Sequence, residues 1–86
     1  MNTYIVTYDL RKSRDYESLY KAIKSYKWAY VLESVWCIVT SDSAKDIRDY
    51  LKGFMDNDDG LFVIKSGTEA AWSNVECSNA WLKDNL

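Results

Sequence analysis

The sequence predicts an α+β domain in which two helices cover one face of an antiparallel sheet. Strand-forming residues gather in three stretches, 3–9, 29–40 and 61–65, and amphipathic helical repeats lie between consecutive stretches. Of the 86 residues, 48% are hydrophobic and 28% are charged, which is typical of a globular chain with one core. We therefore expect residues 1–86 to form a single domain.

The first strand and the first helix have the clearest patterns. In residues 3–9, Tyr4, Val6 and Tyr8 alternate with other bulky or β-branched side chains. Because both faces carry bulk, a central position in the sheet is expected. From Asp15 onward, apolar residues recur at intervals of three and four, which predicts an amphipathic helix. Its buried stripe is expected to comprise Tyr16, Leu19, Tyr20, Ile23 and Tyr26.

The middle of the chain predicts a strand region and a second helix. Residues 29–40 are strand-like throughout, and Glu33-Ser34 marks either a bulge or a tight connection between two strands. Ser43 and Asp46 have the spacing of a helix N-terminal cap. The buried stripe of the second helix is expected at Ile47, Tyr50, Leu51 and Phe54.

An acidic turn at residues 56–60 leads into the strand 61–65, and residues 67–86 form a C-terminal extension. In the extension we expect a short strand or turn, then a terminal helix from about Ser78. The order strand, helix, strand or strand pair, helix, strand is that of the ferredoxin-like βαββαβ sandwich. Two helices cover one face of its antiparallel sheet. A second subunit or the C-terminal extension can cover the other, and a position of the extension at the dimer interface is one expectation.

Charge is distributed unevenly along the chain. The formal net charge is −2, but residues 1–27 carry six basic and three acidic residues, whereas residues 28–86 carry five and ten. This pattern predicts either a basic patch on an acidic body or ordinary solvated helix faces. The acidic bulk favours a small ligand or a protein partner over long duplex DNA.

The residue types and segments that the sequence lacks argue against several classes of function. The sequence has no histidine, which argues against zinc and removes the usual general base near neutral pH. Cys37 lies in an apolar run and is expected to be a buried, reduced thiol. We recognise no signal peptide and no apolar run of the roughly 20 residues that cross a bilayer. We expect a cytoplasmic protein with no membrane partner.

Asp9 is the first candidate site residue. It ends an apolar strand and leads into a loop with three cations, Arg11, Lys12 and Arg14. One interpretation is a polar residue that marks the end of a strand. The other is a metal ligand beside a phosphate backbone, with the three cations as phosphate contacts. In the first case the cations form a solvated loop.

Aromatic residues are numerous for a chain of this length, with four Trp, seven Tyr and two Phe. We expect some of them at a subunit interface, where Tyr and Trp are favoured. Trp28 and Tyr30 either stack on a nucleobase or pack in the core or at an interface. A short chain also buries a limited core, so the sequence predicts a homodimer.

The order of these motifs resembles a known family. An apolar strand ending in Tyr8-Asp9, a basic turn, an amphipathic helix and the stretch Glu-Ser-Val-Trp at 33–36 are similar to the second CRISPR-associated adaptation protein and its stand-alone or phage-encoded relatives. The similarity spans roughly residues 3–66. These relatives are small ferredoxin-like homodimers, and they usually have Ser-Val-Phe where this chain has Ser-Val-Trp.

The resemblance implies roles for individual residues. Asp9 would be both catalytic and metal-binding, near the dimer axis, where two copies hold one Mg²⁺ or Mn²⁺ ion. Ser34 would form local hydrogen bonds. The residues that bind nucleic acid or a nucleotide would be Arg11, Lys12, Arg14, Ser34 and Trp36.

Two functions are therefore expected from the sequence. The first is a homodimer that binds RNA, DNA or a nucleotide and acts as a metal-dependent endonuclease. The alternative is a non-catalytic interaction module that holds a protein partner or sequesters a nucleotide, for example a phage protein acting against host defence. The absence of histidine leaves catalysis open.

Overall fold

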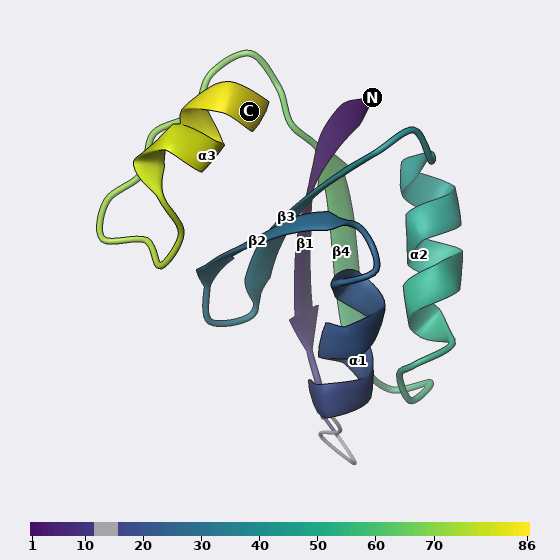
Figure 1. Ribbon diagram of the computed structural model, residues 1–86. Coiled ribbons are helices and arrows are strands. Elements are labelled where there is room, and N and C mark those ends of the chain that lie inside the picture. The colour runs from purple at the N-terminus through teal and green to yellow at the C-terminus, as the bar shows by residue number, and fades with distance from the viewer. Residues whose placement is uncertain (12–15) are drawn as a thin grey trace.

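The computed structural model describes residues 1–11 and 16–86 (Figure 1). Its sheet has the strand order β2-β3-β1-β4, and every neighbouring pair is antiparallel. This order confirms the expected ferredoxin-like α+β fold. No helix in the described part of the chain is long and apolar enough to cross a membrane. The elements are β1 (Asn2–Asp9), α1 (Tyr16–Ile23), β2 (Lys27–Leu32), β3 (Val35–Thr40), α2 (Ala44–Lys52), β4 (Gly60–Lys65) and α3 (Asn79–Asn85).

Strand β1 lies in the interior of the sheet, as its two apolar faces predict. It pairs with β3 from Asn2 to Thr7 and with β4 from Tyr4 to Asp9. Tyr4, Val6 and Tyr8 are buried beneath α1 and α2. Alternate residues of β1 point to the opposite face. Each face of β1 therefore belongs to a different hydrophobic layer.

The layer on the helix side forms the larger core. Its fully buried side chains come from α1, α2 and the two interior strands, which are β1 and β3. They are Leu19, Ile23, Ile47, Leu51, Val6 and Ile38.

The expected stripe of α2 is only half correct. Ile47 and Leu51 are fully buried, whereas Tyr50 and Phe54 are exposed and contact each other with ring centroids 5.3 Å apart. Positions 47 and 51 lie one turn apart on the line that faces the sheet. Tyr50 lies on the flank of that line and contacts the ring of Tyr26 instead.

Two local signals in the sequence correspond to structural features. Glu33-Ser34 forms a tight connection between β2 and β3, with Ser34 in the left-handed region at φ 67°. Ser43 caps α2, because its hydroxyl accepts a hydrogen bond of 3.1 Å from the backbone N–H of Asp46. The tight connection at Glu33-Ser34 separates β2 from β3 and so excludes the alternative of one long strand with a bulge.

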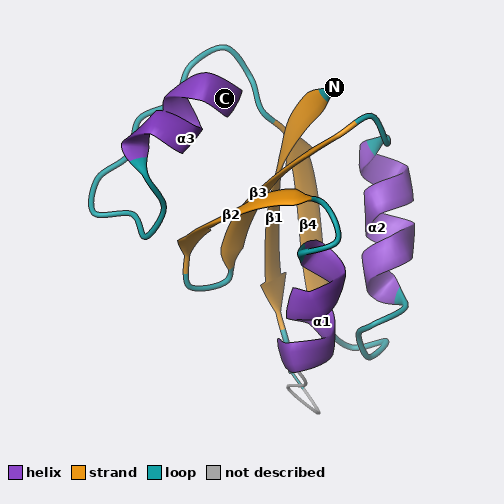
Figure 2. Ribbon diagram, viewed as in Figure 1, coloured by secondary structure: helices purple, strands orange, loops and turns teal. Residues whose placement is uncertain are grey.

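The C-terminal extension, residues 67–86, folds back over the second sheet face (Figure 2). The Glu76 N–H donates to the carbonyl of Val31 at 2.9 Å, and the Thr3 hydroxyl donates to the carbonyl of Asn85. Ser78 caps α3 at the expected position. Leu82 is buried against β2 and β3. The extension therefore covers the β2–β3 half of this face with residues of the same chain.

Candidate functional site

Asp9 lies at the uncovered end of the second sheet face. It is the last residue of β1 and is paired with Gly60 of β4. Strand alternation places it on the same face as Thr7, and its side chain is 72% exposed. Asp9, Thr7, Gly60 and Phe62 help to line a shallow hollow of about 240 Å³. The carboxylate is therefore accessible to a ligand or to a second chain.

Arg11 is held beside Asp9 by the acidic turn before β4. Its Nε lies 3.2 Å from Oδ2 of Asp9. Its backbone N–H donates to Oδ1 of Asp59 at 2.7 Å, and its Nη1 donates to the carbonyl of Asp58 at 3.0 Å. These contacts join two segments almost 50 residues apart in the sequence, so the acidic turn positions the cation next to the carboxylate.

Gly60 allows this close approach. A Cβ atom at this position would lie 2.9 Å from Nη2 of Arg11, which is too close for a side chain without a shift of the guanidinium. Sequence reasoning interpreted residues 56–60 only as a turn and missed the contribution of Asp58, Asp59 and Gly60. Nothing local in the sequence signals contacts with Arg11, because the pairing of β1 with β4 creates them.

Ser34 lies at the same end of the sheet as Asp9. Thr7 is paired with Val35, so the β2–β3 connection that contains Ser34 lies near the end of β1. Lys12 and Arg14 lie outside the described residues. The structure thus brings Asp9 and Arg11 into contact, with Ser34 at the same sheet edge.

Trp36 lies on the other face of the sheet. It is only 3% exposed and packs in the core beneath the helices. Its Nε1 donates to the hydroxyl of Tyr8 at 3.0 Å. Burial, together with a hydrogen bond to Tyr20, raises the pKa of Tyr8 well above its ordinary value. Trp36 and Asp9 therefore do not share one surface.

The described residues offer few ligands for a metal. They contain no group of three or more His, Cys, Asp or Glu side chains placed to hold an ion. Magnesium is commonly held by one or two carboxylates and keeps several waters. Asp9 offers an exposed carboxylate at this end of the sheet, with Asp58 and Asp59 on the far side of Arg11, and two chains would supply a pair of Asp9 carboxylates. Two copies that share one ion would therefore supply two carboxylates, a number that suits Mg²⁺.

A family model described as CRISPR associated protein Cas2 matches residues 1–74. The chain belongs to the Cas2 family. The match includes all four strands, α1 and α2, and it ends before α3. Proteins of the Cas2 family usually form dimers and are generally metal-dependent and nuclease-like.

Solved structures support the same fold. A crystal structure of a hypothetical protein from Thermus thermophilus superposes with a TM-score of 0.67 at 22% sequence identity. The alignment covers 86% of this chain and 93% of that protein. No curated protein matches the sequence. At this identity the likeness shows the fold alone.

Proposed function

We propose that this member of the Cas2 family acts as a homodimer that binds nucleic acid at the end of the sheet where Asp9 and Arg11 lie. The observation that supports this function is the position of the exposed Asp9 carboxylate beside an uncovered apolar strip. The strip consists of Phe62 and Ile64 of β4, which are 59% and 47% exposed, next to Thr7 on β1, which is the partner of Phe62.

The apolar strip supports the proposal of a dimer. Phe62 and Ile64 point away from the core, whereas Leu61 and Val63 pack into it. Adjacent exposed apolar side chains on a sheet face are typical of an interaction surface. A two-fold axis through the hollow at Asp9 and Phe62 would pair this strip with its copy and bring two Asp9 side chains together. The metal site is incomplete without the second copy.

In the dimer, the two Asp9 carboxylates would hold one Mg²⁺ or Mn²⁺ ion. Such an ion polarises a phosphate and activates a water molecule. Arg11 binds a phosphate oxygen of the nucleic acid through its guanidinium. In the free chain this guanidinium contacts Asp9. When a phosphate and a metal ion bind, the guanidinium would contact the phosphate and the Asp9 carboxylate would contact the metal ion.

The nuclease activity is tested by Asp9→Asn. This replacement keeps the shape of the side chain and removes the charge that binds a divalent ion. We expect metal-dependent cleavage of labelled single-stranded RNA and duplex DNA to fall at least about 100-fold, or roughly 2.7 kcal/mol of transition-state stabilisation. The variant should remain folded and dimeric. Undiminished cleavage by Asp9→Asn would show that Asp9 is not catalytic.

A non-catalytic function is the second candidate. It is favoured by the ion pair between Asp9 and Arg11, which occupies the carboxylate, and by the lack of histidine as a general base. In this function the dimer holds nucleic acid, a nucleotide or a protein partner without cutting, as a phage protein acting on host defence would. Binding that depends on Arg11 without cleavage in Mg²⁺ or Mn²⁺ would select this alternative.

A further inference from the structure

An aromatic groove lies on the helix side of the sheet, on the face opposite Asp9. Its lining residues come from α1 and the residue that follows it, from the edge strand β2 and from β3, and its volume is about 360 Å³. This volume lies within the usual range for small-molecule sites. We use the name aromatic groove for the surface lined by Tyr20, Lys24, Trp28, Tyr30 and Trp36.

The floor and the walls of the aromatic groove differ in exposure. Trp36 is buried and forms the floor. The rings of Trp28, Tyr30 and Tyr20 lie against it with centroid distances of 5.3, 4.9 and 5.3 Å. Trp28 is 40% exposed, although its ring is large and apolar. The core therefore holds the floor in place and leaves the wall accessible to a ligand.

The spacing of the two β2 aromatics suits a flat ring. Trp28 and Tyr30 are two residues apart on one face of a strand, so their Cα atoms lie about 6.7 Å apart. Stacked bases lie about 3.4 Å apart. The strand spacing is about twice the stacking distance, so the two side chains present neighbouring aromatic surfaces on which one base can stack.

The residues that line the aromatic groove include a cation, Lys24. Lys24 follows α1, and its Nζ lies 5.1 Å from the centre of the Trp28 ring and 6.0 Å from that of Trp36. Burial raises the pKa of Tyr30, and Tyr20 and the carboxylates of Glu33 and Glu76 add to this rise. The groove thus has a cation next to Trp28 among its lining residues. A ligand with an aromatic ring and an anionic group would place the anion at Lys24.

We propose that the aromatic groove is a second binding site, which takes one nucleobase together with its phosphate. The base stacks on Trp28 and Tyr30, and Lys24 contacts the phosphate. The site does not require Asp9, a metal or a second copy, because the aromatic groove and the Asp9 edge lie on opposite faces of the sheet. Adenosine monophosphate and a short single-stranded oligonucleotide both carry a base with its phosphate, so both serve as test ligands.

The test is a titration of the full chain with fluorescently labelled mononucleotide and with a labelled ten-nucleotide single strand. We expect Trp28→Ala to weaken binding about tenfold, as the loss of one stacking partner does. Lys24→Ala should weaken binding and reduce the slope of log affinity against log salt by about one. Trp28→Phe should retain most of the affinity, because it keeps an aromatic face.

Tyr50→Ala is the matched control. Tyr50 is 42% exposed on α2 and contacts other rings as Trp28 does, but it lies outside the aromatic groove. This variant should bind like the wild type. Circular dichroism of each variant separates a lost contact from a lost fold.

The outcomes separate this site from the proposed function. Loss of affinity in Trp28→Ala but not in Tyr50→Ala supports the aromatic groove, and it does so even when Arg11→Ala binds normally. Tighter binding of the oligonucleotide than of the mononucleotide assigns the groove to single strands, and equal binding assigns it to free nucleotides. Unchanged affinity in folded Trp28→Ala, or equal losses in Trp28→Ala and Tyr50→Ala, would overturn the proposal.

Discussion

At the scale of the residue, Tyr8 and Asp9 are consecutive and yet lie in opposite environments. Tyr8 is buried beneath the helices and accepts a hydrogen bond from Trp36, whereas Asp9 is exposed beside Arg11. The reason is the alternation of side chains along a strand, which points neighbours to opposite faces. This one-residue step separates the core from the candidate site.

Arg11 gives the first prediction at this scale. If it binds phosphate, Arg11→Ala should lower affinity for nucleic acid about three- to tenfold and flatten the salt dependence by about one unit of slope. The measurement is a binding titration at several salt concentrations. The exposed ion pair itself contributes little to stability, so the fold should be retained.

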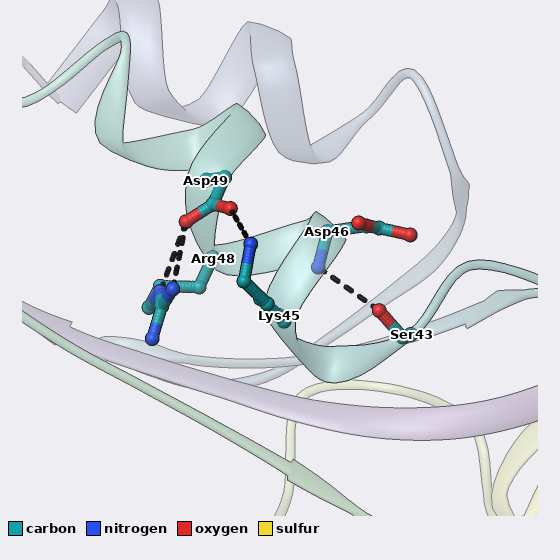
Figure 3. A network of polar contacts seen from close by, with 5 residues as sticks. All are labelled: Ser43, Lys45, Asp46, Arg48 and Asp49. Carbon is teal, nitrogen blue, oxygen red and sulfur yellow. Dashed lines mark hydrogen bonds and ion pairs between the residues drawn. The ribbon is translucent and has the colours of Figure 1, made fainter.

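Arg48 offers a matched control (Figure 3). Its Nη2 lies 2.9 Å from Oδ1 of Asp49, and Lys45 contacts the other carboxylate oxygen at 2.9 Å. These contacts lower the pKa of Asp49, with Lys45 as the largest cause. Arg48→Ala removes the same charge from an exposed ion pair on α2. Equal losses of affinity in the two variants would indicate diffuse attraction without a site at Arg11.

At the scale of the element, the C-terminal extension determines which part of the second sheet face is open. It packs Leu82, Trp81 and Val75 against the β2–β3 half. It is also anchored by polar contacts, among them a 3.0 Å hydrogen bond from Lys27 Nζ to the Asn85 side chain. The match to the family ends at residue 74, so α3 is an addition to the part of the chain that the Cas2 family model covers.

The accessibility of the Cys37 thiol indicates whether the C-terminal extension is docked on the sheet. Cys37 is buried beneath the extension in the same layer as Leu82. Burial, with a smaller effect from Cys77, raises its pKa to about 11. Leu82→Ala should destabilise the docked extension by about 2–4 kcal/mol. We therefore expect a thiol reagent at pH 8 to label Cys37 at least about tenfold faster in this variant, as measured by mass spectrometry of labelled peptides.

Ile47→Ala is the control for that experiment. It removes a fully buried side chain from the opposite layer, beneath α2. If the extension opens locally, Ile47→Ala should accelerate the labelling of Cys37 much less than Leu82→Ala does. The same acceleration in both variants would mean that Cys37 becomes accessible only when the whole domain unfolds.

At the scale of the whole molecule, the two halves of the second sheet face differ. The β2–β3 half is covered by the same chain, whereas Phe62 and Ile64 on β4 remain exposed. Burial of such side chains contributes about 25 cal/mol per Å² of apolar surface. An interface on the apolar strip would bury Phe62 and Ile64, which are the most exposed large apolar side chains of the described strands, and would complete the carboxylate pair at Asp9.

This arrangement predicts the oligomeric state. We expect the wild type to be a dimer at micromolar concentration in multi-angle light scattering. Phe62→Glu should yield monomers, because it would bury an unpaired charge in the interface. Phe54→Glu places the same charge at an exposed aromatic position just after the end of α2 and should leave the dimer intact. A wild type with the mass of one chain would contradict the proposed dimer.

Much of the fold follows from local patterns in the sequence. The alternation in residues 3–9 predicts β1, and the caps at Ser43 and Ser78 mark the beginnings of α2 and α3. These signals arise from steric preferences and hydrogen bonds between residues close in the chain. The order of the elements then left few topologies, of which the ferredoxin-like sheet is the one observed.

Contacts between distant segments decided the rest. The sequence alone marked Asp9 as a strand end beside cations, but only the pairing of β1 with β4 brought Asp59 and Gly60 to Arg11. The periodicity of α2 did not predict that Tyr50 is exposed, because a helical repeat specifies a stripe and not the width of the surface that covers it. The sequence left two covers open for the second sheet face, the C-terminal extension and a second subunit. The structure fills the β2–β3 half with the extension, since burial depends on which surfaces meet in three dimensions.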